Sequence, residues 1–385
     1  MALLGVLYVI YLISTINLMI AMRAGPPTLT LAHELPQSDF GLFWCAGKGL
    51  FAQAVARFGI EAPGTQVFLR TCQVNILSGA APAALAWPYP PLAGFLVVPF
   101  SFIPLAVSFW VWRAFSVVIA GGLLRRAGLG WGVIVAGLAS TAALHDLVGG
   151  QNGTLIAGVL VSALLLAETR PGLAGLLAGL LAVKPQTALV FPAIVLRPRG
   201  MKMLLAGLLT VLAIVALSLA VWGTEGWIWF FKVAEPDEMK QAAAPFTVFF
   251  PAAGITVFSM ARSLGAGLHA AWAWQAASSV AALGLTWGAW RPGAMTPQPR
   301  MALTCALSVL AMPHGFAYDL VAFSIGMAAL YPRAGGWERL TLGLLWLMGG
   351  YTITLANYTG LVLFPVFAVL GAALAWRLRA SPAAR

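Results

Sequence analysis

Runs of apolar residues long enough to cross a lipid bilayer recur along the whole chain, and this pattern constrains the fold more than any other feature. Leu3 to Met22, Met203 to Trp222 and Ala270 to Trp290 are three of them. A helix that spans a bilayer needs about 20 apolar residues, so roughly ten crossings fit into this chain. Of its 385 residues, 61% are hydrophobic and 9% charged. The sequence therefore predicts an all-α fold, a polytopic transmembrane helical bundle that forms a single integral membrane domain over residues 1–385.

The formal net charge of +11 does not indicate a nucleic-acid-binding protein. Most of the 22 Lys and Arg lie in short segments between apolar runs, where positive charges mark the cytoplasmic side. Arg197, Arg199 and Lys202 form the strongest such signal. With the N-terminus inside, this topology places Asp39 and His314 on the outer face. We expect a multi-pass protein of a bacterial inner (plasma) membrane, with its functional site facing the periplasm.

The longest interruption of the apolar pattern is an outer loop over about residues 23–87. Its stretch from Phe40 to Phe58 has the spacing of a helix that lies along the membrane interface, with Lys48 and Arg57 available to lipid head groups. Asp39 comes just before this stretch. Partial desolvation there raises the pKa of a carboxyl towards the range of a general base. Asp is also a preferred helix cap, and taken alone this stretch favours the cap over the general base.

The number of crossings between residues 89 and 199 is left open by the sequence. If Arg125 and Arg126 are cytoplasmic, residues 92–124 cross once with a re-entrant part and Lys184 marks a break in a helix. Otherwise residues 92–124 cross twice and residues 172–196 cross once. A second interruption, over about residues 223–245, is acidic and suits the outer face.

Cysteine usage is sparse, with Cys45, Cys72 and Cys305. Cys45 and Cys72 share the first outer loop and could form a disulfide in an oxidising compartment. Because cysteines of membrane proteins are more often free small hydrophobes, we expect no disulfide. No spacing of Cys and His indicates a metal site.

Ionisable groups inside apolar runs are costly to bury, and they therefore indicate function. Lys184 is such a group. Its ammonium needs an anionic partner, and a lipid phosphate, Asp146 or a carbonyl at the helix break would serve; a side chain that snorkels to the interface is the alternative.

His314 and Asp319 follow a break at Pro313. The histidine could bind phosphate or orient an acid. Asp319 could instead offset the dipole of a helix start, and these residues alone favour that interpretation. His145 and Gln151 could line a polar mouth, although adjacent polar residues in a loop are more often ordinary turn residues.

Taken together, the order of short motifs resembles glycosyltransferase family 87. These are membrane transferases of the GT-C class, typified by the mannosyltransferases that extend phosphatidylinositol mannosides. The matching segments are Ser38-Asp39-Phe40, Tyr89-Pro90-Pro91, Gly150-Gln151-Asn152, Lys184-Pro185, Pro313-His314 and Tyr318-Asp319-Leu320. One departure is that Phe43-Trp44 stands where the family usually has Tyr after the acid.

The resemblance implies a GT-C fold whose long outer first loop carries interfacial helices. It implies transfer of a hexose, mannose at the family level, from a polyprenyl-phosphate donor to a hydroxyl of a glycolipid or glycan acceptor, with inversion. Asp39 would be the general base. The residues that would bind the donor phosphate or substrate are Lys184, His314, Asp319, Tyr89 and Gln151. No metal is expected, and no cofactor besides the donor.

A transporter or lipid flippase is the competing interpretation, because a bundle with broken helices and a buried Lys also fits alternating access. No inverted repeat is visible in the sequence, which favours the enzyme. A non-catalytic scaffold would show no dependence on Asp39, Lys184 or His314.

Overall fold

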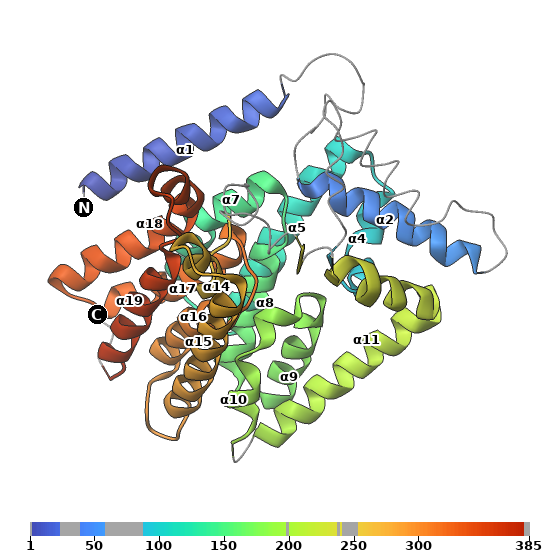
Figure 1. Cartoon of the computed structure of the whole chain (residues 1–385). Coiled ribbons are helices and arrows are strands. Elements are labelled where there is room, and N and C mark those ends of the chain that lie inside the picture. Colours follow the sequence, from blue (N-terminus) through green and yellow to red (C-terminus); the bar gives the residue numbers. More distant parts are fainter. Residues whose placement is uncertain are drawn as a thin grey trace.

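The computed structural model describes residues 2–23, 39–57, 88–197, 200–236, 239–240 and 253–380. Within these residues the chain is a bundle of helices without a β-strand (Figure 1). The predicted all-α membrane architecture is therefore confirmed. In chain order the helices are α1 (Ala2–Arg23), α2 (Asp39–Ala56), η1 (Pro91–Ala93), α4 (Gly94–Ser101), α5 (Leu105–Arg126), α6 (Trp131–Leu138), α7 (Thr141–Gly149), α8 (Gly153–Leu166), α9 (Pro171–Leu180), η2 (Leu181–Val183), η3 (Pro185–Ala188), α10 (Phe191–Val195), α11 (Gly200–Trp229), η4 (Phe230–Ala234), α14 (Val257–Ser263), α15 (Leu268–Ala289), α16 (Pro297–Ala311), η5 (Ala317–Leu320), α17 (Val321–Leu330), η6 (Tyr331–Arg333), α18 (Gly336–Thr359) and α19 (Phe364–Arg377).

In the described part of the chain, three helices are long and apolar enough to cross a membrane: α5, the kinked helical segment Gly200–Ala234 (α11 with η4) and α18. The pair α6 and α7, bent by 55°, makes a fourth if it counts as one span. Shorter apolar helices of 10–17 residues, α8 and α19 among them, fill much of the rest. The expected number of roughly ten crossings stays a prediction.

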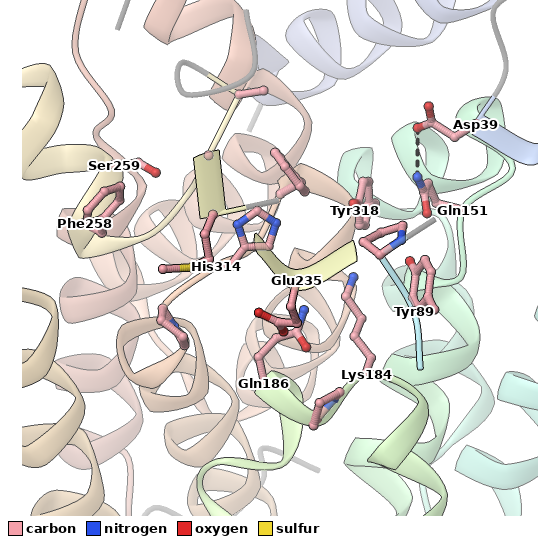
Figure 2. A pocket seen from close by; sticks show the side chains of 18 of the residues that line it. Asp39, Tyr89, Gln151, Lys184, Gln186, Glu235, Phe258, Ser259, His314 and Tyr318 are labelled. Carbon is pink, nitrogen blue, oxygen red and sulfur yellow. Dashed lines mark hydrogen bonds between the residues drawn. The ribbon is translucent and has the colours of Figure 1, made fainter. Parts of the chain in front are cut away.

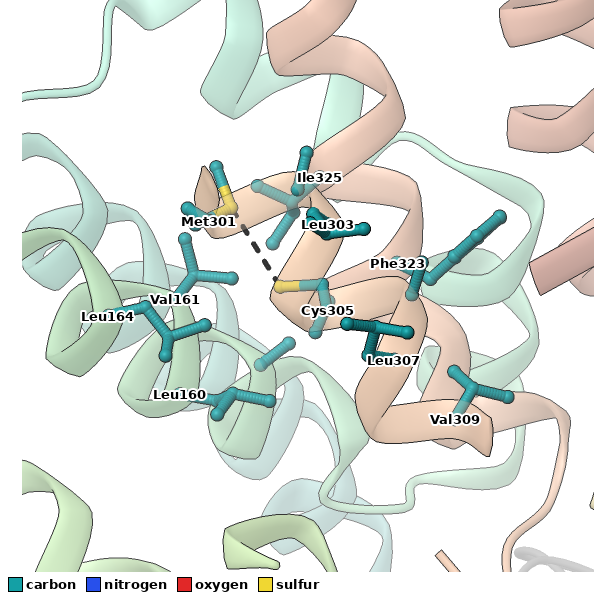
Figure 3. Packing of buried hydrophobic residues seen from close by; sticks show 14 of the residues in the cluster. Leu160, Val161, Leu164, Met301, Leu303, Cys305, Leu307, Val309, Phe323 and Ile325 are labelled. Atoms are coloured by element: carbon teal, nitrogen blue, oxygen red, sulfur yellow. Dashed lines mark hydrogen bonds between the residues drawn. The ribbon is translucent and has the colours of Figure 1, made fainter. Parts of the chain in front are cut away.

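The core of the bundle forms where α8, α16 and α17 meet. Nearly every side chain of α8 is buried, as expected for a helix that is apolar on all sides. Figure 3 shows Leu160, Val161 and Leu164 of α8 facing Met301 and Cys305 of α16. Cys305 is a free, buried cysteine.

The two central helices α8 and α16 connect two polar ends of the molecule. At 14 residues, α8 is about 21 Å long. Its first residue, Gly153, follows the polar turn at Gln151, and its last turn leads to Glu168. Glu168 pairs with Arg300 in the first turns of α16, with two N–O distances of 2.7 and 2.6 Å. From there α16 runs back towards His314.

The end of the bundle around Glu168 is rich in arginine, and we name it the basic end. Glu168 also lies 3.7 Å from Arg197, whose guanidinium donates to the carbonyl of Trp290. Further contacts join the neighbouring segments here, namely Arg333 with Gln298 and Thr296 with the carbonyl of Arg379. We define the basic end by Arg197, Arg300, Arg333 and Arg379.

Helix α11 packs on α9 through small residues. A Cβ atom on Gly175 would lie 2.2 Å from the carbonyl oxygen of Met203, and one on Gly179 would lie 2.7 Å from that of Gly207. Small residues allow helix backbones to approach closely in membranes. The opposite face of α11 carries exposed leucines such as Leu209 and Leu212, which suits contact with lipid. Figure 1 shows α11 along the outside of the bundle.

The predicted helix in the first loop is present as α2, and its place along the membrane interface stays a prediction. Its basic side chains contact protein: the Lys48 ammonium lies 4.5 Å from the centre of a Trp44 ring, and Arg57 donates to the carbonyl of Leu219 at 2.9 Å. Helix α2 packs closely on α4, since a Cβ on Gly47 would lie 2.7 Å from a backbone oxygen of Val97. Cys45 is disulfide-bonded, so the expectation of no disulfide is wrong.

The structure has two features of the first arrangement considered for residues 89–199, and the number of crossings stays a prediction. Helix α4 has 8 residues, too few for a crossing, whereas α5 has spanning length. Further along the chain, the helical stretch from α9 to α10 is interrupted at Lys184, which lies between η2 and η3. The segment expected to be an acidic loop, about residues 223–245, is helical over its described first part, because α11 continues to Trp229 and η4 follows.

Candidate active site

One cavity of about 490 Å³ collects most of the residues that the sequence singles out. Five of the six predicted site residues line it, namely Asp39, Tyr89, Gln151, Lys184 and His314. They come from five separate segments between α2 and η5. Figure 2 shows their side chains around the same space.

Asp39 is the first residue of α2, so it occupies the first helical position and not the capping position before it. Its Oδ2 accepts a hydrogen bond of 2.9 Å from Nε2 of Gln151, which lies 112 residues further along the chain. Burial raises the pKa of the Asp39 carboxyl, and the hydrogen bond from Gln151 opposes this rise. A carboxylate with a raised pKa and one defined donor suits a general base.

Gln151 is held in place by its backbone. Its N–H donates to the carbonyl of Asp146, and its carbonyl accepts from Nε1 of Trp112 at 3.0 Å. The turn depends on Gly150, which ends α7 in the left-handed conformation with φ of 67°. Oε1 of Gln151 is buried and has no hydrogen-bond partner among the described residues, so it is available to a hydroxyl of a ligand.

Asp146 organises the start of α8. Its two carboxylate oxygens accept from the backbone N–H groups of Gly153 and Thr154, at 2.7 and 2.8 Å. This satisfies orphan donors at a helix N-terminus. Asp146 therefore holds the turn that carries Gln151. Asp146, one of three partners considered for Lys184 from the sequence, is not its ion-pair partner, although the charge of Lys184 acts on it.

The counter-ion of Lys184 is Asp319. Asp319 was not among the partners considered for Lys184 from the sequence. The Lys184 ammonium donates to Oδ1 of Asp319, and the two side chains are 5% and 2% exposed. Oδ2 of Asp319 accepts from the N–H of Phe316 at 3.0 Å. Asp319 thus fixes the Lys184 ammonium without lining the cavity itself. Lys184 does line the cavity, and its Nζ lies 4.5 Å from the centre of the Tyr318 ring.

The segment that carries His314 lines the cavity with a row of three aromatic rings. His314, Phe316 and Tyr318 all line it, with ring centres 4.8 and 5.6 Å apart along the row. Phe316 has an extended backbone, with φ of −125° and ψ of 174°, and the chain then turns into η5, which carries Tyr318. A backbone hydrogen bond from Ile255 to Gly315 fixes the segment from the other side.

Several lining residues were not among the predicted site residues. His145 was noted in the sequence only as part of a possible polar mouth, and Glu235 only as part of an acidic segment. Phe258 and Trp272 belong to apolar runs and gave no signal. The full set of such residues with polar or aromatic side chains includes His145, Gln186, Phe230, Glu235, Phe258, Ser259, Trp272, Phe316 and Tyr318.

Glu235 reaches the cavity because its helix is broken twice. Gly223 interrupts α11 with φ of 70°, a conformation that favours glycine. The chain then forms the π-helix η4, which ends next to Glu235. π-Helical turns are rare and frequent at functional sites.

The arrangement brings a half-buried carboxylate and a buried ammonium to one cavity. Asp39 can accept a proton from a hydroxyl, and Lys184 can stabilise charge on a departing phosphate. Within the described ranges, no group of three or more His, Cys, Asp or Glu is disposed to hold a metal ion. Metal independence stays a prediction.

The comparison with protein families gives one match. The family model described as glycosyltransferase family 87 matches residues 87–313, which is more than half of the chain. Tyr89, Gln151 and Lys184 lie inside the matched range. No curated protein and no solved structure matches the chain.

Proposed function

The chain belongs to glycosyltransferase family 87, and on this premise we propose that it transfers a hexose, most simply mannose, from a polyprenyl-phosphate donor to an acceptor hydroxyl, with inversion. The acceptor is a glycolipid or a glycan. Asp39 is the general base of this proposal, and Lys184 and His314 bind the donor phosphate.

The observation that carries the proposal is the joint presence of Asp39 and Lys184 at one cavity. A base and a cation at separate points of the cavity suit the two ends of an in-line displacement. Inversion requires one carboxylate to activate the nucleophile on the face of the sugar opposite the leaving group. The leaving group here is already a phosphate and needs no second acid.

In the proposed step, the acceptor oxygen attacks C1 of the donor hexose while its proton passes to Asp39. The bond between C1 and the phosphate oxygen breaks, and the electron pair leaves with the polyprenyl phosphate. The ammonium of Lys184 stabilises this developing charge. Asp319 does not touch the cavity in this scheme, and it acts by holding Lys184 in position.

Tyr89 and Gln151 have binding roles in the proposal. Tyr89 is buried and packs edge-on against Phe43, with ring centres 5.5 Å apart, so its position at the cavity wall is defined. Oε1 of Gln151 accepts a hydrogen bond from a hydroxyl of the substrate, while Nε2 keeps its hydrogen bond to Asp39.

Two features support an active site on the outer face of the membrane. The basic end lies at the opposite ends of α8 and α16 from the cavity, and positive charge marks the cytoplasmic side. Cys45, which sits on the same helix as Asp39, is disulfide-bonded, and disulfides persist in oxidising, non-cytoplasmic compartments. We infer that the protein resides in a bacterial inner membrane with the cavity open to the periplasm.

The test measures transfer of radiolabelled hexose from a panel of polyprenyl-phosphate hexoses, with the wild-type protein and two variants in matched amounts. Asp39→Asn should lower transfer by about 100- to 10,000-fold while donor binding persists. The control is Glu225→Gln, an exposed acid of α11 outside the cavity, and it should transfer normally. Full activity of Asp39→Asn would exclude Asp39 as the base. Absence of transfer with every donor would favour a transporter or lipid flippase over the transferase.

A further inference from the structure

Exposed arginines at the basic end lie over the rings of exposed tryptophans. Three such pairs occur at the ends of α15, α18 and α19, with the guanidinium carbon 5.3, 5.0 and 5.4 Å from the ring centre: Arg291 with Trp287, Arg379 with Trp376, and Arg377 with Trp337. These tryptophans are 49%, 46% and 58% exposed. A guanidinium that lies on a ring still presents the N–H groups at its edge, so it can bind a further ligand.

Two of these three arginines have no counter-charge. Arg377 forms an ion pair with Glu338 at 2.6 Å. Among the described residues, neither Arg291 nor Arg379 has an ion-pair partner, and the one hydrogen bond that either guanidinium makes runs from Arg379 to the carbonyl of Trp376. The charge of both side chains is therefore left for an anionic ligand.

Arg291 and Arg379 belong to one patch, because the loop after α15 is bonded to the end of α19. The N–H and the hydroxyl of Thr296 both donate to the carbonyl of Arg379, at 3.2 and 3.1 Å. A turn, closed by a bond from the N–H of Ala294 to the carbonyl of Arg291, lies in the same loop. We name the set of Arg291, Arg379, Trp287 and Trp376 the arginine–tryptophan patch.

The chemistry of this patch fits the phosphate of a phospholipid. Guanidinium groups bind phosphate oxygens through paired N–H donors. Tryptophan rings prefer the boundary between the head groups and the hydrocarbon of a bilayer, which is the depth of lipid phosphates. Two positive charges without counter-ions favour a lipid of net negative charge over a zwitterionic one, and the cytoplasmic leaflet supplies such lipids.

An apolar groove of about 290 Å³ lies between α15 and α19, the two helices that end at the patch. Both helices pack on α16 (Figure 1), and Leu307 and Leu310 of α16 form the floor of the groove. Leu285 and Val369 line it and are 60% and 54% exposed, so it opens towards the membrane. Val369 precedes Trp376 by about 10 Å along α19, less than the roughly 15 Å of hydrocarbon in one leaflet. An acyl chain that extends from the patch therefore reaches the groove.

We propose that the arginine–tryptophan patch and this groove bind one anionic phospholipid of the cytoplasmic leaflet. Its phosphate contacts Arg291 and Arg379, and one of its acyl chains enters the groove at Val369. This lipid is distinct from the proposed donor, because the patch and the cavity lie at opposite ends of α16. The site does not depend on the transfer reaction.

Lipid binding is measured by native mass spectrometry of the purified full-length protein in detergent. The probes are dioleoyl phosphatidylglycerol, which is anionic, dioleoyl phosphatidylcholine, which is zwitterionic, and glycerol 3-phosphate, which is an anionic head without chains. We expect phosphatidylglycerol to bind about 30-fold more tightly than phosphatidylcholine, since each of the two arginines contributes about fivefold. Glycerol 3-phosphate should bind far more weakly than phosphatidylglycerol, because it places nothing in the groove.

Two double variants locate the head group. Arg291→Gln/Arg379→Gln should abolish the preference for phosphatidylglycerol and leave Tm without lipid unchanged, because both side chains are exposed. Arg125→Gln/Arg126→Gln is the matched control. It removes the same charge from two exposed arginines at the end of α5, neither of which lies over an aromatic ring of the described residues, and it should keep the wild-type preference.

Two single variants locate the acyl chain, and both change an exposed small residue of α15. Ala281 lines the groove, so Ala281→Phe should weaken phosphatidylglycerol binding by about tenfold, the loss of roughly two buried methylene groups. Gly284 does not line the groove and has nothing within 4 Å of a Cβ position, so Gly284→Phe should bind like the wild type.

Equal affinity of the wild type for the two lipids would overturn the site, and so would a preference that survives Arg291→Gln/Arg379→Gln. A preference that the α5 double variant removes just as fully would mean that net charge alone attracts the lipid, which also overturns the site. Glycerol 3-phosphate that binds as tightly as phosphatidylglycerol would overturn the lipid as the occupant.

Discussion

Nε2 of Gln151 lies 2.9 Å from Oδ2 of Asp39, and this bond joins the first residue of α2 to the turn between α7 and α8. The backbone of Gln151 is held by Asp146 and by Trp112. The donor to the carboxylate is thus fixed before any substrate enters. Gln151 positions the proposed base, and it also influences the pH at which the base is ionised.

The first prediction concerns the pH dependence of transfer. Burial raises the pKa of Asp39 and the bond from Gln151 lowers it, so Gln151→Leu should raise it further. A general base acts in its ionised form, so kcat/KM falls as the pH falls through this pKa. The acidic limb of the profile should therefore move to higher pH by about one to two units, the worth of a hydrogen bond to a charged group.

Gln298→Leu is the control for this experiment, because Gln298 lies at the basic end and accepts from Arg333. Its acidic limb should coincide with that of the wild type. A limb that moves to lower pH in Gln151→Leu, or does not move, would contradict the role given to the hydrogen bond.

Much of the site could be predicted from the sequence because its key residues interrupt apolar runs. Lys184 stands out for this reason, since charge at membrane depth is costly, and so does the break before His314. Membrane-length apolar runs likewise sufficed for the all-α bundle. What the sequence could not supply was the partner of Lys184, because 135 residues separate it from Asp319.

Other features stayed hidden because their signal is tertiary. Trp272 has the same local sequence environment as Trp274, and only the packing of α15 on α14 turns one of them into the cavity. Glu235 reads as part of an acidic loop until Gly223 and the π-helix redirect the chain. The prediction that Cys45 forms no disulfide rested on how often cysteines of membrane proteins are free. Such a frequency does not tell whether Cys45 lies close to another cysteine in the fold, and Cys45 is disulfide-bonded.

The second prediction concerns the ion pair of Lys184 and Asp319. Asp319→Asn leaves a buried ammonium without a counter-charge, which should lower the free energy of unfolding by about 3–5 kcal/mol. Thermal unfolding of the purified protein in detergent measures the effect as a lower Tm. The double variant Lys184→Met/Asp319→Asn should regain most of the stability but remain inactive, because the cation for the phosphate is gone.

Glu338→Gln is the control for the ion pair. Its partner Arg377 is 63% exposed and Glu338 itself 13%, and a surface pair contributes about 1 kcal/mol at most. Glutamine keeps an oxygen that accepts from the N–H of Gly335, so Tm should change far less than in Asp319→Asn. A stable Asp319→Asn variant would contradict the structural role of Asp319, and an active double variant would contradict the role of Lys184.

The third prediction concerns the close approach of α8 to the segment that carries Tyr318. A Cβ on Gly153 would lie 2.0 Å from the backbone oxygen of Tyr318, so Gly153→Ala must push the two segments apart. We expect a lower Tm and reduced transfer together, since Asp146 holds the N–H of Gly153 and Lys184 lies against the ring of Tyr318. Gly284→Ala in α15, where nothing lies within 4 Å, should keep or raise Tm, because alanine favours helix. Equal Tm values for the two variants would contradict the packing.

The fourth prediction concerns the orientation of the protein in the membrane, and it uses the two ends of α18. This helix has 24 residues and is about 36 Å long, enough to span a bilayer. Trp337 near its start is 58% exposed and Tyr358 near its end is 88% exposed. Between them Ile353 lines the cavity, so Tyr358 lies towards the cavity and Trp337 towards the basic end.

Single cysteines at these two positions report the orientation through a membrane-impermeant maleimide. The background carries Cys305→Ala, which removes the buried free thiol, while Cys45 stays because it is disulfide-bonded. Since the basic end should be cytoplasmic, Tyr358→Cys should be labelled in right-side-out vesicles and Trp337→Cys in inverted ones. The reverse pattern would put the cavity on the cytoplasmic side. Labelling of both cysteines in the same vesicles would mean that α18 does not cross the membrane.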